Sequence, residues 1–383
     1  MIGKLDESIW HQLPTTFDHV HTSDPRFYDR HWHAVYDPAG AGALQFTLGA
    51  YSNMNVLDAG LVVVHQGRQH NLRASRSLRP SFLEEVGPFR LEVLEPMRRH
   101  RIVITGEPGT IRGELEWLAV ADAEEEPPHF SRHLGRIREG YTRYDQLGRC
   151  DGELDLGGRR VRIENWWATR DHSWGTRPGV GVEEPDNDPS IEMTEGAGGR
   201  RSHWPFSQFL FMHFFFSTEE FSGHVLSFFK DGHMVRLDGF IRDELDPRRA
   251  HQVATDMRLH VDLHPGTRRM RHLDMYLTLE GGRKVKFDIT GLGPSIAMTG
   301  LGYSGGFTDG LGQGVWRGDN LVEHEVWDVS DPAIVRDRSG QDLQPLHRIQ
   351  PVSAVSSGAI TAAGTGSLTF VFEGELPEGV THA

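Results

Sequence analysis

The stretch of sequence that says most about the fold is Asn165-Trp166-Trp167-Ala168-Thr169-Arg170-Asp171-His172-Ser173-Trp174-Gly175-Thr176-Arg177. Tryptophan is large and apolar and carries one N–H group, so three tryptophans this close together predict a packed wall with a polar edge. Asp171 and His172 form an acid/base pair in that setting, since burial shifts the pKa of either group. The structural alternative is a tryptophan corner, in which Arg170 and Asp171 tie a turn between strands or domains. Both interpretations can hold together.

Length and composition set the broad class of the protein. A chain of 383 residues can bury sizeable cores and is expected to form two or three domains. The formal net charge of −14 argues against a nucleic-acid partner, which calls for a basic face. No apolar run approaches the roughly 20 residues that span a bilayer, so stable membrane insertion is not expected. Cys150 is the single cysteine, which fits a reducing cytoplasm, and residues 1–10 show no export signal.

Short strands with alternating apolar and polar residues dominate the chain, as half-buried sheets require. They are expected at 44–48, 60–65, 90–94, 101–104 and 111–120, and then at 209–216, 223–229, 234–241, 257–263, 272–280, 284–289, 315–317, 321–329 and 367–372. Regular short strands separated by turn residues favour a β-sandwich or a β-barrel. We therefore predict an all-β protein with two similar-sized domains, residues 1–160 and 161–383.

Other segments are expected to be turns, loops or a helix. Residues 122–129 hold three consecutive glutamates and two prolines, which predicts a solvated loop. Turns are expected at Asp145-Gln146-Leu147-Gly148 and at Gly157-Gly158. Residues 77–86 form the most helix-like segment. The polar, glycine-rich residues 179–201 are expected to form a mobile loop or lid over the C-terminal domain.

The histidine content raises the question of a metal, because the chain has 22 histidines. The closest local pairs are His19/His21, His31/His33 and His260/His264. A mononuclear site needs three or four convergent ligands, and none of these pairs comes with a recognisable second half. The glycines at 310, 312 and 314 lack the βαβ unit of a dinucleotide site. We therefore expect neither a metal nor another cofactor.

The tryptophan-rich stretch also resembles a known signature. Trp-Trp-x-x-Arg-Asp-His-Ser-Trp-Gly-x-Arg, at residues 166–177, resembles a motif of the AttH-like and carotenoid 1,2-hydratase-like proteins. A second matching region is GQGVWRG at 312–318, followed by EHEVWD at 323–328. The resemblance implies two tandem lipocalin-like antiparallel β-barrels, a fold that can enclose a small apolar ligand. It further implies hydration, cyclisation or isomerisation, with tocopherol cyclases and Diels–Alderase-type proteins as more distant relatives.

The function expected from these observations is that of a cofactor-independent hydratase/dehydratase or isomerase/cyclase. Its substrate would be an apolar terpenoid, steroid or polyketide-like molecule. Protonation of an alkene needs a strong acid in a dry pocket, and Asp171 with His172 is the first candidate. Neighbouring residues of a regular strand face opposite sides, so this pair meets one pocket only if the chain turns there. Tyr303, His213 and Asp238 are the other candidate catalytic residues.

Aromatic faces next to the acid would stabilise a carbocation, and a few polar groups would orient the substrate. The candidate substrate-binding residues are Trp167, Trp174, His203, Phe211, Trp316 and Glu325. Glu323 and Glu325 share one face of their strand, where a solvated edge is the alternative to paired carboxylates. The alternative function is a non-catalytic carrier of a hydrophobic ligand, which needs the cavity but no acid. The expected partner is a small apolar molecule, and a homodimer is compatible with the sequence.

Overall fold

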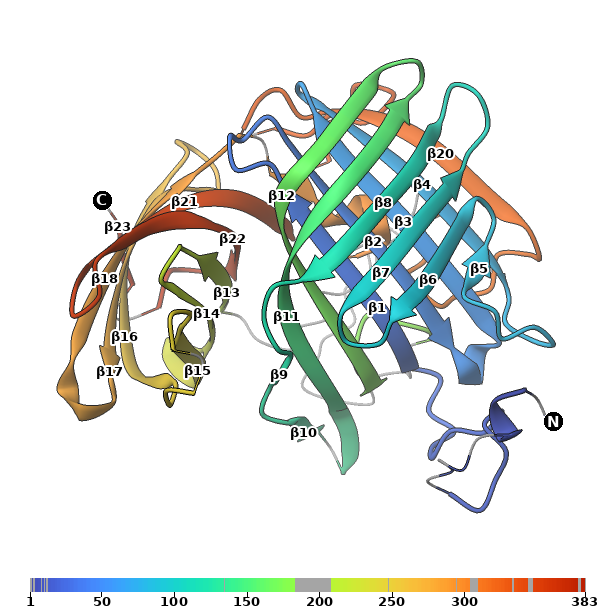
Figure 1. Ribbon diagram of the computed structural model, residues 1–383, viewed down its shortest axis with the longest axis horizontal. Coiled ribbons are helices and arrows are strands. Elements are labelled where there is room, and N and C mark those ends of the chain that lie inside the picture. Colours follow the sequence, from blue (N-terminus) through green and yellow to red (C-terminus); the bar gives the residue numbers. More distant parts are fainter. Residues whose placement is uncertain are drawn as a thin grey trace.

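Almost all of the chain that the structure describes is β-structure or the turns between strands (Figure 1). The computed structural model describes residues 2, 4–7, 9, 11, 13–133, 135–182, 208–246, 248–293, 295–303, 309–332, 334–343, 347–377 and 380–382. In these ranges the helices are four short 3₁₀ turns, Lys4–Glu7, Ser52–Met54, Glu280–Gly282 and Met298–Leu301. No helix in the described ranges is long and apolar enough to cross a membrane. The predicted all-β class is confirmed.

The first sheet has 13 strands and curls strongly without closing on itself (Figure 1). Its neighbouring strands are, in order, β20 (Leu321–Asp328), β4 (Arg68–Ser77), β3 (Val56–His65), β2 (Gly42–Tyr51), β1 (Phe27–Tyr36), β12 (Arg160–Thr176), β11 (Arg136–Leu156), β8 (Ile111–Ala119), β7 (Arg99–Thr105), β6 (Phe89–Glu95) and β5 (Glu85–Val86). Two short strands, β9 (Glu124–Glu125) and β10 (His129–His133), also pair with β11. The long β11–β12 hairpin therefore forms the middle of this sheet.

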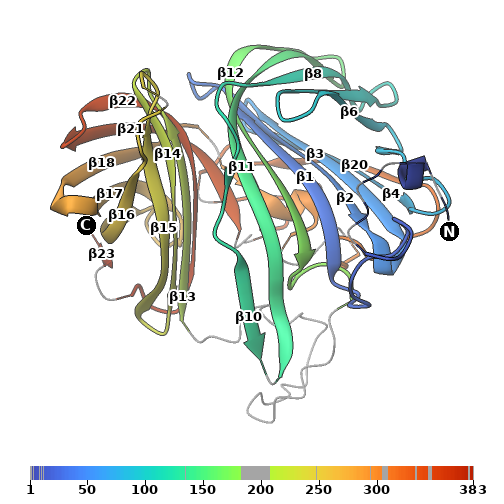
Figure 2. The ribbon, with the colours of Figure 1, turned by 60° about the horizontal axis from the view of Figure 1, so that its bottom comes forward.

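The second sheet closes into a barrel of eight strands, beside the first sheet in both views (Figures 1 and 2). The barrel strands are, in order, β15 (His233–Asp243), β14 (Phe221–Lys230), β13 (Phe209–Ser217), β22 (Ala362–Glu373), β21 (Arg348–Gly358), β18 (Lys284–Gly291), β17 (Met270–Leu279) and β16 (Gln252–Leu263). Pairing of β15 with β16 closes the ring. Two further short strands, β19 (Ile296–Ala297) and β23 (Val380–His382), pair with β21 and β16. We call this unit the second barrel.

The division between the two units lies elsewhere than the sequence predicts. A boundary at residues 160 and 161 would cut β12 at its start, but all of β12 pairs with β1 and β11 in the first sheet. The first sheet also takes β20 from the C-terminal half of the chain, next to β4. Arg73 on β4 explains this position, because its buried guanidinium lies 3.2 Å from Glu323 and 3.4 Å from Glu325 of β20. A buried cation needs such counter-charges.

Apolar side chains form a core in each unit and a third core between the units. The inner face of the first sheet packs around residues such as Phe46, and the interior of the second barrel around residues such as Phe214. The core between the units includes Trp32 and Trp167 of the first sheet and Phe215 of the second barrel. Residues 213 and 215 of β13 therefore point toward the first sheet, because side chains alternate along a strand. The two units share one continuous interface.

The turn predicted at residues 145–148 is absent, because β11 runs unbroken from Arg136 to Leu156. Asp145, Gln146 and Leu147 are buried, and all three pair with residues of β12. The predicted turn at Gly157-Gly158 is correct, and both glycines have positive φ. The polar residues of 145–148 suggest a turn when the sequence is considered alone. The strands that pair with them across the sheet show that they are part of β11. Burial of polar groups by a second unit is invisible to a local pattern.

Three further expectations fail or fall outside the described residues. The predicted helix at 77–86 is a loop ending in β5, and the Arg76 guanidinium holds it through hydrogen bonds to five carbonyl oxygens, including those of Leu83 and Glu85. The strand expected at 315–317 is irregular chain. Most of the expected lid at 179–201 lies outside the described residues, which resume at residue 208.

Replacing Gly314 by alanine is expected to lower the free energy of unfolding by about 2–4 kcal/mol. Gly314 has a φ of 73°, and a Cβ atom there would lie 2.4 Å from the Tyr51 ring. Its N–H also donates a hydrogen bond of 2.6 Å to the buried Asp58. The control is Gly310→Ala, which has the same φ but open space around the new Cβ and should cost about 1 kcal/mol. Urea unfolding measures both, and equal costs would contradict the contact with Tyr51.

Candidate functional site

Asp171 and His172 do not meet in one pocket. Both lie in the regular part of β12, so their side chains project from opposite faces of the first sheet. His172 points to the concave inner side of the sheet, and Asp171 points toward the second barrel. The chain makes no turn there, which was the condition for a joint site. The acid/base pair expected from the sequence is therefore divided between two environments.

On the inner side, His172 belongs to a polar cluster within the first sheet. Its Nε2 lies 2.7 Å from Asp29 Oδ1, and its Nδ1 lies 3.2 Å from the Tyr144 hydroxyl. The ring of His31 stacks on it with 4.1 Å between centroids. Arg170 faces the same side and donates a 2.9 Å hydrogen bond to Gln146. The expected Arg170–Asp171 clasp is therefore not formed, because the two side chains point to opposite faces.

On the outer side, Asp171 lies beside a buried arginine. Arg30 NH2 is 4.0 Å from Asp171 Oδ1, and the Ser173 hydroxyl donates to the same oxygen at 3.3 Å. Arg30 also donates a hydrogen bond to the Tyr303 hydroxyl. Two of the predicted catalytic residues, Asp171 and Tyr303, are therefore linked through one guanidinium. This guanidinium balances the Asp171 carboxylate and gives it a structural partner.

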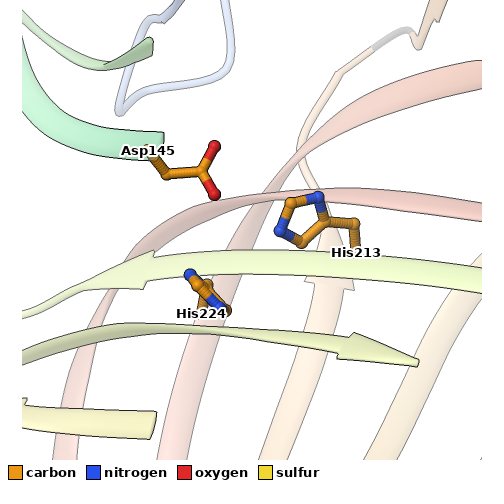
Figure 3. A group of neighbouring side chains, drawn as sticks. All are labelled: Asp145, His213 and His224. Atoms are coloured by element: carbon orange, nitrogen blue, oxygen red, sulfur yellow. The ribbon is translucent and has the colours of Figure 1, made fainter. Parts of the chain in front are cut away.

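A third group of side chains converges at the interface between the units. Asp145 of β11, His213 of β13 and His224 of β14 place one ligand-type atom each within 4.8 Å of one another. Figure 3 shows the Asp145 carboxylate and the two imidazoles turned toward a common point. All three residues are at least nine-tenths buried. We call these three residues the interface cluster.

The interface cluster presents polar atoms that no described residue satisfies. Among the described residues, Asp145 Oδ2, His213 Nε2 and His224 Nε2 are all buried and have no hydrogen-bond partner. Buried polar groups are nearly always paired, since an unpaired one costs about 1–3 kcal/mol. Three such atoms at one point indicate a site that binds a further polar group.

Glu126 controls the protonation of Asp145. Arg143 binds the Glu126 carboxylate through two hydrogen bonds, of 2.8 and 2.7 Å, and His129 adds a third of 2.6 Å. Burial opposes ionisation of Glu126, but Arg143 and these hydrogen bonds hold its pKa well below the usual range. Burial first, and then the charge of Glu126, raise the pKa of Asp145 well above its usual range. Asp145 therefore keeps its proton to higher pH than an ordinary aspartate does, beside a Glu126 that loses its proton more readily than usual.

The two histidines of the interface cluster are shifted in the opposite sense to Asp145. Burial lowers the pKa of His213 well below its usual value and also lowers that of His224. Both imidazoles are therefore neutral at pH 7 and can accept a proton. A carboxyl group with a raised pKa facing two imidazoles with lowered pKa values fits the rule that enzymes assign acid and base roles by pushing pKa values apart. The site can donate a proton from one residue and accept it on another.

Some of the other predicted site residues lie near the interface cluster. Asp238, on β15, binds Arg236 at 3.2 Å, and Arg236 in turn donates to His129 Nδ1 at 3.0 Å. Asp238 therefore belongs to the hydrogen-bond network around Glu126. Phe211 lies on the same face of β13 as His213, with 6.4 Å between the ring centroids. His213, Asp238 and Phe211 therefore lie in one part of the interface, and their roles stay predictions.

Four of the predicted substrate-binding residues lie away from the interface cluster. Trp167 packs on Tyr36 in the core between the units, with ring centroids 5.6 Å apart. Trp174 is 39% exposed beside His172, and Trp316 is 47% exposed. Glu325 lies near Arg73 and accepts a 3.1 Å hydrogen bond from Trp327, which favours a structural role. His203 lies outside the described residues.

Sequence reasoning missed four residues of this site: Asp145, His224, Glu126 and Arg143. Glu126 was expected in a solvated loop, but its side chain is buried against Arg143. The sequence signal that could have found this site is the spacing of Arg143 and Asp145, which places both side chains on one face of a strand. That signal becomes informative only when β11 is seen to continue through both residues. His224 carries no local signal, because it lies in an ordinary alternating strand.

Two groups of side chains in the described residues have the donor types of a metal site. The interface cluster offers two imidazoles and one carboxylate, a set found in zinc and iron proteins. The other group, His272, Asp274 and Asp288, lies at the surface of the second barrel. The interface cluster therefore has two chemical interpretations, as an acid with two bases or as a ligand set, and experiment must separate them.

A cavity of about 550 Å³ lies at one end of the second barrel. None of the residues predicted from the sequence as catalytic or substrate-binding is among those that line it. It is lined instead by the turn between β16 and β17 and by residues of β21 and β22. This cavity is therefore a feature separate from the interface cluster.

Stability is expected to fall as the pH drops below about 6.5, because several histidines are buried in neutral form. Burial lowers the pKa of His31 and His33 well below the usual value, and that of His100 to about 4. The unfolded chain binds protons at these positions near pH 6.5 and the folded chain does not. Each histidine therefore removes about 1.4 kcal/mol of stability per pH unit below 6.5. His33→Gln should reduce this slope in urea unfolding at pH 7.5, 6.5 and 5.5, and an unchanged slope would argue against burial of a neutral His33.

Known structures resemble this chain in fold at low sequence identity. A protein assigned as AttH from Nitrosomonas europaea gives a TM-score of 0.52 at 11% identity, over 95% of this chain and 98% of that one. CghA, crystallised with Sch210972, gives 0.49 at 10% identity over 92% and 89% of the two chains. Kievitone hydratase from Nectria haematococca gives 0.47 at 10% identity over 90% and 88%. The AttH structure confirms the fold that the sequence resemblance implied.

Sequence comparison adds the family. No curated protein matches the chain. One family model does match it, over residues 2–374, which is nearly its whole length. The chain therefore belongs to the family of unknown function DUF8625.

Proposed function

We propose that this protein adds water to, removes water from, or cyclises an apolar small molecule by acid/base catalysis at the interface cluster. The observation that carries the proposal is the convergence of three buried polar atoms, Asp145 Oδ2, His213 Nε2 and His224 Nε2, which lack partners among the described residues. A reacting alkene or alcohol would supply the missing contacts. Terpenoid, steroid or polyketide-like molecules are the substrate classes that this chemistry suits.

Each residue of the cluster takes a defined role in the hydration direction. Asp145 gives up the proton that it shares with Glu126 to one alkene carbon, and a water molecule adds to the other carbon. His213 or His224 accepts the proton that this water loses, so no cofactor enters the reaction. The imidazolium then returns a proton to Asp145, and the net change is the addition of one water. Dehydration follows the same steps in reverse.

Aromatic rings around the cluster suit a cationic intermediate. The ring of Phe215 lies 4.2 Å from that of His213, and the ring of Phe240 lies 4.9 Å from that of His224. Aromatic faces attract a cation by about 0.5–2 kcal/mol, more when water is excluded. The ionised Glu126 stays paired with Arg143 throughout and keeps Asp145 protonated. Glu126 and Arg143 are therefore positioning residues in this proposal.

A solvent-label experiment tests the proposal without knowledge of the natural substrate. The protein is incubated in H₂¹⁸O with a panel of apolar alkenes and tertiary alcohols of the terpenoid and steroid classes, and chromatography with mass spectrometry detects incorporated ¹⁸O, loss of water and isomeric products. Turnover is expected for at least one panel member, with loss in Asp145→Asn and no effect of a chelator. Loss of turnover on chelation, with recovery on adding Zn²⁺ or Fe²⁺, would make the cluster a metal ligand set and overturn the acid/base assignment.

The alternative function, a carrier of a hydrophobic ligand, makes a different prediction in the same experiment. A carrier binds panel members and releases them unchanged, so calorimetry detects binding while no label is incorporated. Substitution of Asp145 by asparagine would then leave the affinity within about threefold. Binding without turnover across the panel would therefore replace the catalytic proposal by the carrier.

A further inference from the structure

The cavity at the end of the second barrel has one apolar wall. Leu368, Phe370 and Phe372 of β22 line it, together with Met270 at the start of β17. All four side chains belong to the apolar core of the second barrel. At about 550 Å³ the cavity has the size of a small-molecule site, since such sites run from about 300 to 1,000 Å³. It can therefore hold a hydrocarbon group against this wall.

Cationic side chains also line the cavity. Arg348 at the start of β21, Arg268 and Arg269 in the turn between β16 and β17, and His264 all line it. The single acidic residue among its lining residues is Glu373. The charges of Asp342 and Asp331 lie close enough to raise the pKa of Arg348, against the larger effects that lower it. Among the residues that line the cavity there are three arginines and one carboxylate, with Asp331 and Asp342 close to Arg269 and Arg348.

Among the described residues, no carboxylate pairs with the buried Arg348. Its side chain is more than nine-tenths buried, and its NH1 donates a 2.9 Å hydrogen bond to Ser295. Its Nε and NH2 are buried without a hydrogen-bond partner in the described part of the chain. No described carboxylate forms an ion pair with it, and burial, followed by the neighbouring charge of Arg269, lowers the pKa of Arg348 to about 8. A buried cation in this state costs several kcal/mol until an anion binds.

The free edge of the guanidinium indicates which anion fits. Nε and NH2 of one arginine form a planar fork that binds the two oxygens of a carboxylate. A free inorganic anion would use this fork but leave the apolar wall of the cavity uncovered. We propose that the second barrel binds an amphipathic carboxylate, with its head on the Nε and NH2 of Arg348 and its chain against Leu368, Phe370 and Phe372. This site is independent of the interface cluster and of the function proposed for it.

Titration calorimetry with simple probes tests this site on the intact protein. The probes are dodecanoate, dodecanol, dodecyl phosphate and inorganic phosphate, each below its aggregation limit. Dodecanoate is expected to bind about 10- to 100-fold more tightly than dodecanol, because a charge-assisted pair is worth that factor. Inorganic phosphate should not compete at millimolar concentration. Equal affinity for dodecanoate and dodecanol would overturn the role of Arg348, and tight binding of inorganic phosphate would overturn the role of the apolar wall.

Arg348→Met separates charge from shape, because methionine fills similar space without a cation. The variant should lose the 10- to 100-fold preference for dodecanoate and keep its affinity for dodecanol within about threefold. Arg271→Met is the matched control, since Arg271 lies one residue after Met270 but is 59% exposed and paired with Asp262. It should leave all affinities unchanged. Preference for dodecyl phosphate over dodecanoate would overturn the assignment of a carboxylate head. If Arg348→Met does not fold, the comparison of probes on the unaltered protein still decides.

Discussion

Replacing Arg143 by methionine is expected to lower the free energy of unfolding by about 3–5 kcal/mol, because Glu126 would stay buried without its main counter-charge. Arg143 Nε and NH2 both bind the Glu126 carboxylate, which is fully shielded from solvent. Loss of one partner from a buried ion pair costs far more than loss of an exposed pair. Urea unfolding followed by circular dichroism measures the difference at pH 7.

Two comparisons make this prediction specific to the buried pair. Arg112→Met removes an exposed pair with Asp155, formed at 2.9 Å by a side chain that is 51% exposed, and should cost at most about 1 kcal/mol. The double variant Arg143→Met/Glu126→Gln removes both charges and should recover part of the loss. If Arg143→Met costs no more than Arg112→Met, then Glu126 is not the buried anion that raises the pKa of Asp145.

Replacing Asp145 by asparagine is expected to lower turnover about 10²- to 10⁴-fold on any substrate found with the label experiment, since this is the contribution of a general acid. Asparagine keeps the size of the side chain and still donates a hydrogen bond to Glu126. It carries no acidic proton, so the alkene is not protonated. The measurement is the initial rate of ¹⁸O incorporation at pH 7.

Stability and pH distinguish a chemical role from a structural one. Asp145→Asn should leave the free energy of unfolding within about 1 kcal/mol of the parent value, because the hydrogen bond to Glu126 persists. Turnover of the parent protein should fall as the pH rises through the raised pKa of Asp145, since the acid then loses its proton. Full activity in Asp145→Asn would move the acid to another residue, and Asp171 would be the first to examine.

Local patterns in the sequence predict the fold better than the site. Alternation identifies strands such as Gln252–Leu263, because one face lies against an apolar core, and a continuous apolar run identifies the buried strand Phe209–Ser217. The resemblance of residues 166–177 to the AttH-like signature correctly predicts the pair of β units. The chain order of the strands, however, does not reveal that β20 joins the first sheet. That pairing brings Glu323 next to Arg73, which lies far away in sequence.

The site is poorly predicted because its parts come from two units. Asp145 and Glu126 look like turn and loop residues when only their sequence neighbours are considered. Their burial results from contact between β11 and the outer face of the second barrel, and no local period encodes that contact. His213 is the exception, because a histidine in a phenylalanine-rich strand already indicates a buried polar group. Residues that meet across such an interface can be recognised as one site only in the structure.

The place of β20 at the edge of the first sheet has a consequence for the biogenesis of this protein. Leu321 pairs with Ser75, so the contact joins positions separated by more than half of the chain. During synthesis, β4 leaves the ribosome long before β20 does. Until β20 is made, the edge of β4 that pairs with β20 is open. Contacts of this range also slow folding, since a long loop must close before they form. A fragment that ends after β12 would keep that edge permanently open, and we expect it to aggregate when expressed alone.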